Sequence, residues 1–447
     1  MLASTIPIVT DLIREAAHPL LDLASDYDAL FKCIGEARFV LLGEASHGSH
    51  EFYRERARIT QRLIREKGFN AIAVEADWPD AYRVNRYVQG DNTDSDATEA
   101  LSGFKRFPAW MWRNADLLDF VGWLRSHNDS LMPERRIGFY GLDLYSLHAS
   151  MERVLLYLDK VDPAAAQRAR LRYACFDNSG HDPQAYGYAA GLGLRPSCEN
   201  EAVTQLIELQ NNALRYARMD GFAAIERFFD AEQNARVVKD AEEYYRSMFR
   251  GSVHSWNLRD HHMAETFEAL AEHLNREDLP AKIVVWAHNS HIGDARATQM
   301  GQQGECNIGQ LIRELHGRDC RNIGFTTFTG TVTAATDWDS PAERKRIRQA
   351  RPDSYEGLLH QIGLPAFFLI MEPGTSLSHG LEEPMLERAI GVVYRPETEF
   401  ASHYFKASLS QQFDAVIHLD ETRAVEPMES IAENLLDEPA ETFPSGI

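Results

Sequence analysis

The sequence predicts an α/β protein with a mainly parallel β-sheet core flanked by helices and with a large helical insertion. Short apolar runs recur along the chain with helical patterns between them. Most runs are continuous rather than alternating, which is typical of strands buried on both faces. Between about residues 147 and 280 the runs stop, and long amphipathic helical patterns take their place. The expected strands cover residues 38–44, 70–77, 136–143, 282–289, 322–328, 366–371 and 415–421.

These elements divide the chain into four parts. Two parts form the α/β core, a helical subdomain separates them, and an acidic, Pro-containing tail follows, which we expect to be loosely held. In chain order the parts are residues 1–146 (core), 147–280 (helical subdomain), 281–424 (core) and 425–447 (tail). Within the subdomain, helical patterns at 199–219 and 222–249 follow a Gly- and Pro-containing segment at 177–197.

The composition argues against several classes of protein. The 447 residues include 46 basic and 67 acidic side chains, which give a net charge of −21 at neutral pH. Such a chain repels nucleic acid and anionic membranes unless a local basic patch intervenes, and we find none in the sequence. No segment approaches the roughly 18 apolar residues of a membrane span, and the N-terminus does not have the pattern of a signal peptide. We therefore expect neither nucleic acid nor membrane as a partner.

The number and spacing of the cysteines indicate the redox state of the compartment in which the protein is found. They are odd in number, far apart and in no C-x-x-C pair, so they predict neither a disulfide scaffold nor a zinc knuckle and fit a reducing compartment. The five are Cys33, Cys175, Cys198, Cys306 and Cys320. We therefore expect a cytoplasmic protein.

A glycine-rich loop follows the first expected strand. The stretch FVLLGEASHGSH, residues 39–50, has the G-x-x-x-x-G outline of a phosphate-binding P-loop. It lacks the lysine of that motif, and Glu44 inside the loop would repel phosphate. The helix that follows, about Glu51 to Lys67 and ended by Gly68, places Arg56 on its apolar stripe. A buried arginine at this position needs an acidic partner; the alternative is a side chain that extends to solvent at the edge of the helix.

Polar residues end several expected strands. Glu44 ends the first and Glu75 the second. Because a helix connects these strands, they should run parallel, often as neighbours, with both carboxylates at the carboxyl edge of the sheet. The same edge should receive the residues that follow the other strands. Together with His47 of the loop, these are Asp143, His288 and His291. Such a gathering of titratable residues predicts a functional site.

This set of residues supports general acid–base chemistry. A neutral imidazole takes a proton from water, a carboxylate orients the imidazole, and a cation stabilises the developing oxyanion, so hydrolysis needs no covalent enzyme intermediate. The G-x-S-x-G motif of serine hydrolases is missing from the sequence. Two alternatives stay open. One is a metal-dependent hydrolase with His47, His288 and His291 as ligands; the other is a non-catalytic protein that binds a ligand or metal at the same place.

At these residues the sequence resembles the erythromycin esterase family. The matching motifs are LLGEASHGSHEFYRERARIT, IAVEADW, YGLDLYS, SWNLRDHHMAETF and VVWAHNSHIG, in this order between residues 41 and 293. The resemblance implies an α/β core and a helical subdomain with a cleft between them. It also implies hydrolysis of a macrolide lactone, or of another ester, by activated water.

The resemblance further implies a role for each residue. His47 is implied as the general base, and Glu44 and Glu75 as groups that orient or activate around it. Arg56 is implied as a buried structural or electrostatic partner. The remaining catalytic pair is His288 and His291.

Four more residues are candidates for substrate binding: Arg259, Asp143, Trp110 and Trp112. Arg259 lies in the fourth motif, and its alternative role is an ordinary helix-surface arginine. The two tryptophans belong to the aromatic-rich stretch 103–125, which could form the wall of an apolar substrate cleft. Core packing is the alternative for both. The sequence thus predicts an ester or macrolactone hydrolase that uses no metal and no other cofactor.

Overall fold

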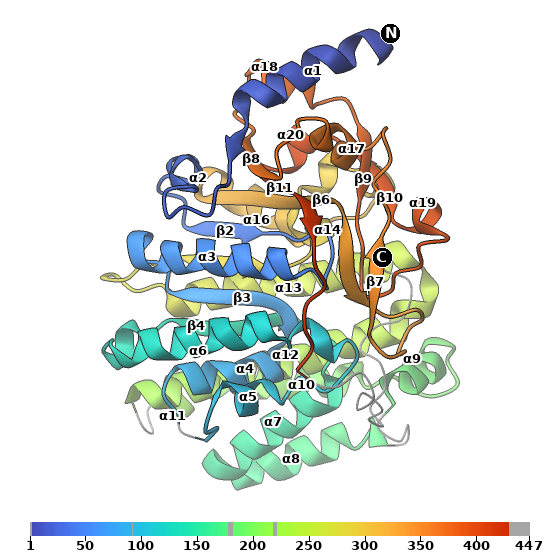
Figure 1. Cartoon of the computed structure of the whole chain (residues 1–447). Coiled ribbons are helices and arrows are strands. Elements are labelled where there is room, and N and C mark those ends of the chain that lie inside the picture. The colour runs from blue at the N-terminus through green and yellow to red at the C-terminus, as the bar shows by residue number, and fades with distance from the viewer. Residues whose placement is uncertain (1, 92, 178–181, 218–220, 429–447) are drawn as a thin grey trace.

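The structure is a computed structural model that describes residues 2–91, 93–177, 182–217 and 221–428 (Figure 1). Within these residues a sheet of nine strands forms the centre, in the order β1-β8-β11-β6-β2-β5-β3-β4, and β7 pairs with the C-terminal part of β6. Neighbouring strands from β11 to β4 are parallel, whereas β8 is antiparallel to β11. The predicted α/β fold with a mainly parallel sheet is therefore confirmed.

A strand forms in each of the seven expected regions. These strands are β2 (Phe39–Leu42), β3 (Ala71–Asp77), β4 (Gly138–Asp143), β5 (Ile283–Trp286), β6 (Cys320–Ala334), β8 (Ala366–Ile370) and β11 (Ala415–Thr422). The part of the chain described here holds four more, which the apolar pattern does not reveal: β1 (His18–Pro19), β7 (Glu343–Ile347), β9 (Met385–Arg388) and β10 (Tyr404–Ala407). The sequence of β7 is ERKRI, and a search for apolar runs misses such a charged strand.

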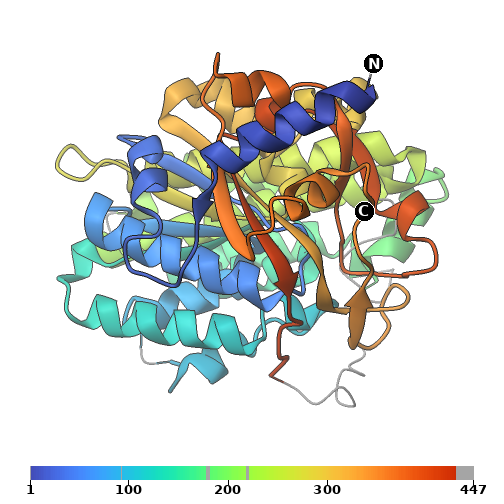
Figure 2. The ribbon, with the colours of Figure 1, turned by 45° about the horizontal axis from the view of Figure 1, so that its top comes forward.

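The central strands are buried on both faces, as their continuous apolar runs predict. In β2, Val40 and Leu42 pack into one hydrophobic cluster, and Phe39 and Leu41 pack into another on the opposite face. Helices on both sides of the sheet are visible in Figure 2. Those in the first cluster include α3 (His50–Lys67) and α6 (Ala115–Asp129), and those in the second include α13 (Ser252–Leu274) and α16 (Ile308–His316).

The strand order differs from the expectation that β2 and β3 are neighbours. The two strands are parallel, but β5 lies between them and pairs with both. Every central strand is apolar on both faces, so the local pattern carries no information about which strand lies beside which. As a consequence, the residues that follow β5 enter the site between Glu44 and Glu75.

Helices fill the region between β4 and β5 in the residues that the structure describes. They are α7 (Leu147–Val161), α8 (Pro163–Tyr173), α9 (Pro183–Gly191), α10 (Glu199–Asn211), α11 (Ala213–Ala217), α12 (Gly221–Ser247) and α13. Side chains from α7 to α12 share a hydrophobic cluster of their own, and α7, α8 and α11 lie at the lower end of the ribbon in Figure 1. The Gly- and Pro-containing segment at 177–197 thus holds a short helix, α9. The division of the chain into domains stays a prediction.

The cysteine expectation needs correction. Cys175 and Cys198 form a disulfide, with their Cα atoms 5.9 Å apart. The bond joins the end of α8 to the start of α10, which contact each other in the helical region. Such a pairing follows from helix packing, so the spacing of cysteines along the chain does not show it.

Two further expectations concern the tail and the membrane. Of the predicted acidic tail at 425–447, residues from 429 onward lie outside the described part of the chain. Before that point, Val425 N–H donates to the Gly48 carbonyl, which ties the chain to the loop after β2. Among the described helices, none has the length and apolar character needed to cross a bilayer.

Candidate active site

The loop after β2 brings Glu44 and His47 to the carboxyl edge of the sheet, and β6 packs tightly against it. The N–H of Thr333 in β6 donates to the Gly48 carbonyl at 3.1 Å. A Cβ on Gly48 would lie 1.9 Å from the carbonyl oxygen of Thr333. The second glycine of the motif is therefore required because a neighbouring strand approaches the backbone, and phosphate binding need not be invoked to explain it.

Arg56 lies against this loop and holds Glu44. Its Nη2 donates to Oε2 of Glu44 at 2.7 Å, and both side chains are fully buried. The guanidinium also lies over the rings of Tyr53 and Trp286, at 4.4 and 5.0 Å from their centroids. Arg56 thus faces the sheet, as the helical pattern predicts, and its acidic partner is Glu44.

The second oxygen of Glu44 determines which nitrogen of His47 carries the proton. Nδ1 of His47 lies 2.9 Å from Oε1 of Glu44. A carboxylate held by a guanidinium only accepts hydrogen bonds, so the imidazole must donate from Nδ1. In the neutral ring this leaves a lone pair on Nε2. The His47 side chain is 7% exposed, and its Nε2 is the atom at which it can accept a proton.

A second cluster surrounds Glu75 at the end of β3. Oε1 of Glu75 accepts from Nη2 of Arg259 at 2.9 Å, and Oε2 accepts from the backbone N–H of His288 at 2.8 Å. Burial acts to raise the pKa of Glu75, but His291, Arg259, His47 and the N–H of His288 together hold that pKa well below its usual range. Glu75 is therefore a carboxylate in the folded protein at neutral pH.

Arg259 reaches the cluster from α13 and joins Glu75 to Asp143 of β4. Nε of Arg259 lies 3.0 Å from Oδ1 of Asp143, and Nη1 lies 3.1 Å from Nε2 of His291. Burial acts to lower the pKa of Arg259, but Asp143, Tyr145 and Glu75 raise it well above its ordinary value. Arg259 is therefore a charged member of the cluster and not an ordinary surface arginine.

His291 lies between two carboxylates. Its Nδ1 is 3.0 Å from both oxygens of Asp260, and its Nε2 is 3.3 Å from Oε1 of Glu75. The ring of Trp256 stacks on the imidazole, with centroids 4.5 Å apart. Burial acts to lower the pKa of His291, but Asp260 and Glu75 raise it above the ordinary value. Asp260 therefore faces Nδ1 of His291, and Nε2 lies between the Glu75 carboxylate and the Arg259 guanidinium.

His288 is held in the opposite protonation state. Burial, followed by His47 and His291, lowers the pKa of His288 well below its usual range, although Glu75 and the Ala45 carbonyl act to raise it. The ring is therefore neutral.

The neighbours of His288 also select its tautomer. Its Nδ1 accepts from the backbone N–H of Ser290 at 3.2 Å, where His288 caps the short helix α14 (Asn289–Ile292). The proton of the neutral ring is then on Nε2. In the described part of the chain this buried atom forms no hydrogen bond of good geometry. The ring centroids of His288 and His47 are 4.8 Å apart, so this donor lies close to an imidazole that can accept a proton.

The predicted site residues are thus brought together with two exceptions. Trp110 and Trp112 are 2% and 5% exposed and belong to the hydrophobic core. Trp112 Nε1 donates to the backbone carbonyl of Glu75 at 3.2 Å, so Trp112 contacts the backbone of the cluster at Glu75. Contact of either tryptophan with a substrate stays a prediction.

Two members of the site, Asp260 and Trp256, escape analysis of the sequence. Both lie on α13 in the SWNLRDHHMAETF motif, next to Arg259. Trp256 and Asp260 are four residues apart and Arg259 lies between them, so helical spacing places all three close to one face. That spacing is a signal, but the sequence does not show that this face turns toward His291.

The histidines are not arranged as metal ligands. Across residues 2–428, apart from the gaps given above, no group of three or more His, Cys, Asp and Glu side chains is placed to hold a metal ion. Both nitrogens of His291 face Asp260, Glu75 or Arg259. His291 therefore has no nitrogen free to complete the set of three histidine ligands in the metal-dependent alternative.

This architecture is shared with known proteins. The chain is 22% identical to erythromycin esterase type II of Escherichia coli over 428 residues, which are 91% of this chain and 94% of that protein. A solved succinoglycan biosynthesis protein aligns with a TM-score of 0.76 at 21% identity, covering 95% of this chain and 99% of that one. An erythromycin esterase mutant in its open conformation aligns with a TM-score of 0.64 at 17% identity, covering 89% and 94%.

The two likenesses to solved structures establish the shared fold. The family is established by sequence, because the family model described as erythromycin esterase matches residues 64–422, well over half of the chain. The protein is therefore a member of the erythromycin esterase family of hydrolases.

Proposed function

We propose that the protein hydrolyses an ester or a macrolactone by general-base activation of water, with His47 as the base and without a covalent intermediate. One observation carries this proposal: the buried chain of contacts from Arg56 through Glu44 to Nδ1 of His47. It fixes the tautomer that leaves Nε2 able to take a proton from water, and Glu44 stabilises the imidazolium that forms.

The other side chains supply the electrostatic part of the reaction. Attack of water on an ester carbonyl places negative charge on the carbonyl oxygen, and preorganised donors stabilise that charge. The Nε2–H of His288 is such a donor, because it forms no hydrogen bond of good geometry in the described residues and its ring lies 4.8 Å from that of His47, measured between centroids. Behind it, Glu75 holds the backbone N–H of His288, so the ring keeps its position as charge develops.

The family relation guides the choice of substrate. Erythromycin esterase type II of Escherichia coli is named for a macrolide, so we propose macrolide lactones as the first substrates to test, together with simple esters. The substrate in this proposal is a small molecule. A non-catalytic binding protein would use the same residues but would show no turnover.

The test is hydrolysis by purified wild type and His47→Ala. Incubation with a panel of macrolides and esters, followed by chromatography and mass spectrometry, should show ring-opened or cleaved product for at least one substrate. We expect His47→Ala to lose at least about 10²-fold in kcat/KM, the contribution of a general base. If no panel member is turned over faster by the wild type than by the variant, the proposal fails for these substrates.

Metal analysis of the same protein separates the metal-dependent alternative. Wild type purified without added metal is analysed by mass spectrometry for zinc, manganese and iron, and is assayed before and after chelator treatment. We expect activity to survive the chelator. Stoichiometric metal that is lost together with activity would contradict the proposed mechanism.

A further inference from the structure

The segment before α16 is fastened to one face of α13, next to the candidate active site. The indole Nε1 of Trp256 donates to the carbonyl of Cys306 at 2.9 Å, and the N–H of Ile308 donates to Oδ1 of Asp260 at 2.9 Å. Trp256 stacks on the imidazole of His291, and Asp260 contacts the edge of the same ring. Both residues of α13 that face His291 are therefore held in place from outside their own helix.

Asp260 directs both of its oxygens at one nitrogen of His291. Each oxygen lies 3.0 Å from Nδ1, and the side chain of Asp260 is 0% exposed. A buried carboxylate is costly unless donors satisfy it. The N–H of Ile308 supplies one donor, and a proton on Nδ1 of His291 supplies another. The position of Asp260 thus favours a His291 ring that is protonated at Nδ1.

The proton between Asp260 and His291 belongs to the imidazole. Burial raises the pKa of Asp260, although His291, Arg259 and the N–H of Ile308 act to lower it. Burial acts to lower the pKa of His291, but Asp260 and Glu75 raise it above its ordinary value. Because an imidazole is intrinsically a stronger base than a carboxylate, the proton stays on Nδ1. Nδ1 is then protonated in the neutral ring and in the imidazolium alike.

The other nitrogen of His291 faces the rest of the site. Nε2 lies 3.3 Å from Oε1 of Glu75 and 3.1 Å from Nη1 of Arg259. With a proton, Nε2 donates to Glu75; without one, it accepts from Arg259. Two more titratable groups act on the ring, His288 at the start of the same short helix and Glu305 in the segment before α16. The ring therefore changes its charge at Nε2, where both kinds of partner are in place.

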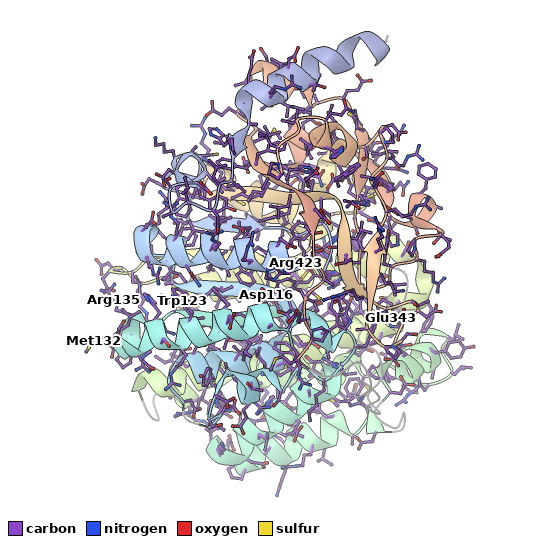
Figure 3. All side chains as sticks on the ribbon, viewed as in Figure 1. Asp116, Trp123, Met132, Arg135, Glu343 and Arg423 are labelled. Carbon is purple, nitrogen blue, oxygen red and sulfur yellow. A yellow bond between two sulfur atoms is a disulfide. The ribbon has the colours of Figure 1, made fainter. Side chains whose placement is uncertain are left out.

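The Asp260–His291 pair repeats the arrangement of the Glu44–His47 pair. In each pair a buried carboxylate faces Nδ1, at 3.0 Å in the first and 2.9 Å in the second. Both pairs lie at the carboxyl edge of the sheet. In Figure 3 the label Arg423 marks this edge, because Arg423 contacts the first turn of α3, directly after the loop that carries His47. The same device thus holds a histidine on two sides of the site.

We propose that Asp260 is a positioning residue for hydrolysis: its carboxylate orients the ring of His291 and keeps Nδ1 protonated, so that Nε2 alone exchanges a proton with the site. The inference rests on the proposed function, because it assigns a role within the hydrolytic site. Asp260 acts only through His291, since its oxygens are turned toward that ring and toward the N–H of Ile308.

The first test observes the protonation of His291 directly and needs no turnover. NMR spectroscopy of wild type labelled with ¹⁵N-histidine gives the chemical shifts of both ring nitrogens across the pH range in which the protein is folded. The signals that are missing from His291→Gln identify the ring. We expect Nδ1 to stay protonated throughout and titration to occur at Nε2. Loss of the proton from Nδ1 would overturn the inference, even in an enzyme that hydrolyses esters.

The second test compares Asp260→Asn with the matched control Asp240→Asn. Both substitutions keep the shape of the side chain and remove its charge. Oδ2 of Asp240 lies 2.7 Å from Nδ1 of His262, a buried histidine on the same helix as Asp260. Within the described residues this second pair shares no hydrogen-bond partner with His291. Thermal unfolding verifies that both variants are folded.

We expect the pKa of His291 to fall by about 1 or more in Asp260→Asn, because the substitution removes an opposite charge next to Nδ1. The pKa should be unchanged in Asp240→Asn. On a substrate that wild type hydrolyses, kcat of Asp260→Asn should fall at least about tenfold, with KM within about threefold of wild type. Asp240→Asn should keep both constants within about threefold.

The outcomes separate this inference from the proposed function. An unchanged pKa of His291 in Asp260→Asn, or equal losses of kcat in the two variants, would overturn the role of Asp260 while hydrolysis itself stands. If wild type turns over no substrate, the proposed function fails for the substrates tested, and the protonation of Nδ1 in wild type still decides whether Asp260 holds His291 in the inferred state.

Discussion

Replacing Glu44 by Gln tests the tautomer argument with almost no change in shape. Arg56 offers only donors to Glu44, and His47 shares the other oxygen. In the variant, the amide oxygen must face Arg56 and the amide nitrogen must face Nδ1 of His47. Nδ1 then has to accept, and the proton of the neutral ring moves to Nε2. His47 stays in place but loses the lone pair that takes a proton from water.

The magnitude follows from two separate effects. When the histidine of a serine protease triad is held in the wrong tautomer, kcat falls by about 10⁴-fold, which corresponds to about 5 kcal/mol of barrier. The fold is also weakened, because Arg56 keeps its charge at 0% side-chain exposure without a carboxylate. Breaking a buried ion pair in this way costs about 3–5 kcal/mol of stability. Since the amide oxygen still accepts from Arg56, we expect a loss of about 3 kcal/mol.

The assay needs a control variant that is less stable than wild type but keeps the proton of His47 on Nδ1. Glu55→Gln is suitable, because Glu55 lies next to Arg56 on α3 and is 3% exposed. It accepts hydrogen bonds from Tyr27 Oη at 2.8 Å and from Arg54 Nε at 2.7 Å. Unfolding in urea gives the stability of both variants, and initial rates on the best substrate of the panel give kcat and KM. We expect Glu55→Gln to keep its kcat. A kcat of Glu44→Gln within tenfold of wild type, in folded protein, would refute the assignment of the proton to Nδ1.

Two further predictions concern the pH dependence of stability and activity. Glu75→Gln should abolish hydrolysis. Because the folded pKa of Glu75 is depressed, its stabilisation is present above the unfolded pKa of about 4.3 and is lost as pH falls through the folded pKa. The stability difference between wild type and this variant should therefore shrink in acid, and a constant difference in urea unfolding would contradict this. Glu387→Gln should change the pH dependence of stability at the alkaline end of the pH range. Both Glu387 oxygens are buried, without a hydrogen bond of good geometry in the described residues. Burial and Glu356 raise its pKa well above the ordinary value, so its contribution is full in acid and lost as pH rises through the folded pKa. The melting temperature of the variant should fall less toward alkaline pH than that of wild type, and parallel curves would show that Glu387 has an ordinary pKa.

The candidate site shows how far local patterns lead. Helical spacing places Arg56 toward the sheet, and the ends of β3 and β4 identify Glu75 and Asp143, because parallel strands bring their carboxyl ends to one edge. The structure adds Asp260 and Trp256, which the sequence analysis misses. Their helix, α13, has more than one buried face, since it packs against the sheet, against other helices and against the site. A single period cannot separate these faces.

By itself, the sequence determined the positions of the seven main strands, the fold class and the loop that carries Glu44 and His47. These features depend on the burial of residues close together in the chain, and burial leaves a local period or an uninterrupted apolar run. The tertiary structure alone decided that β5 lies between β2 and β3, that Cys175 meets Cys198, and that Asp260 faces His291. Each of these depends on contacts between segments far apart in sequence, and no local pattern records which distant segment will be the neighbour.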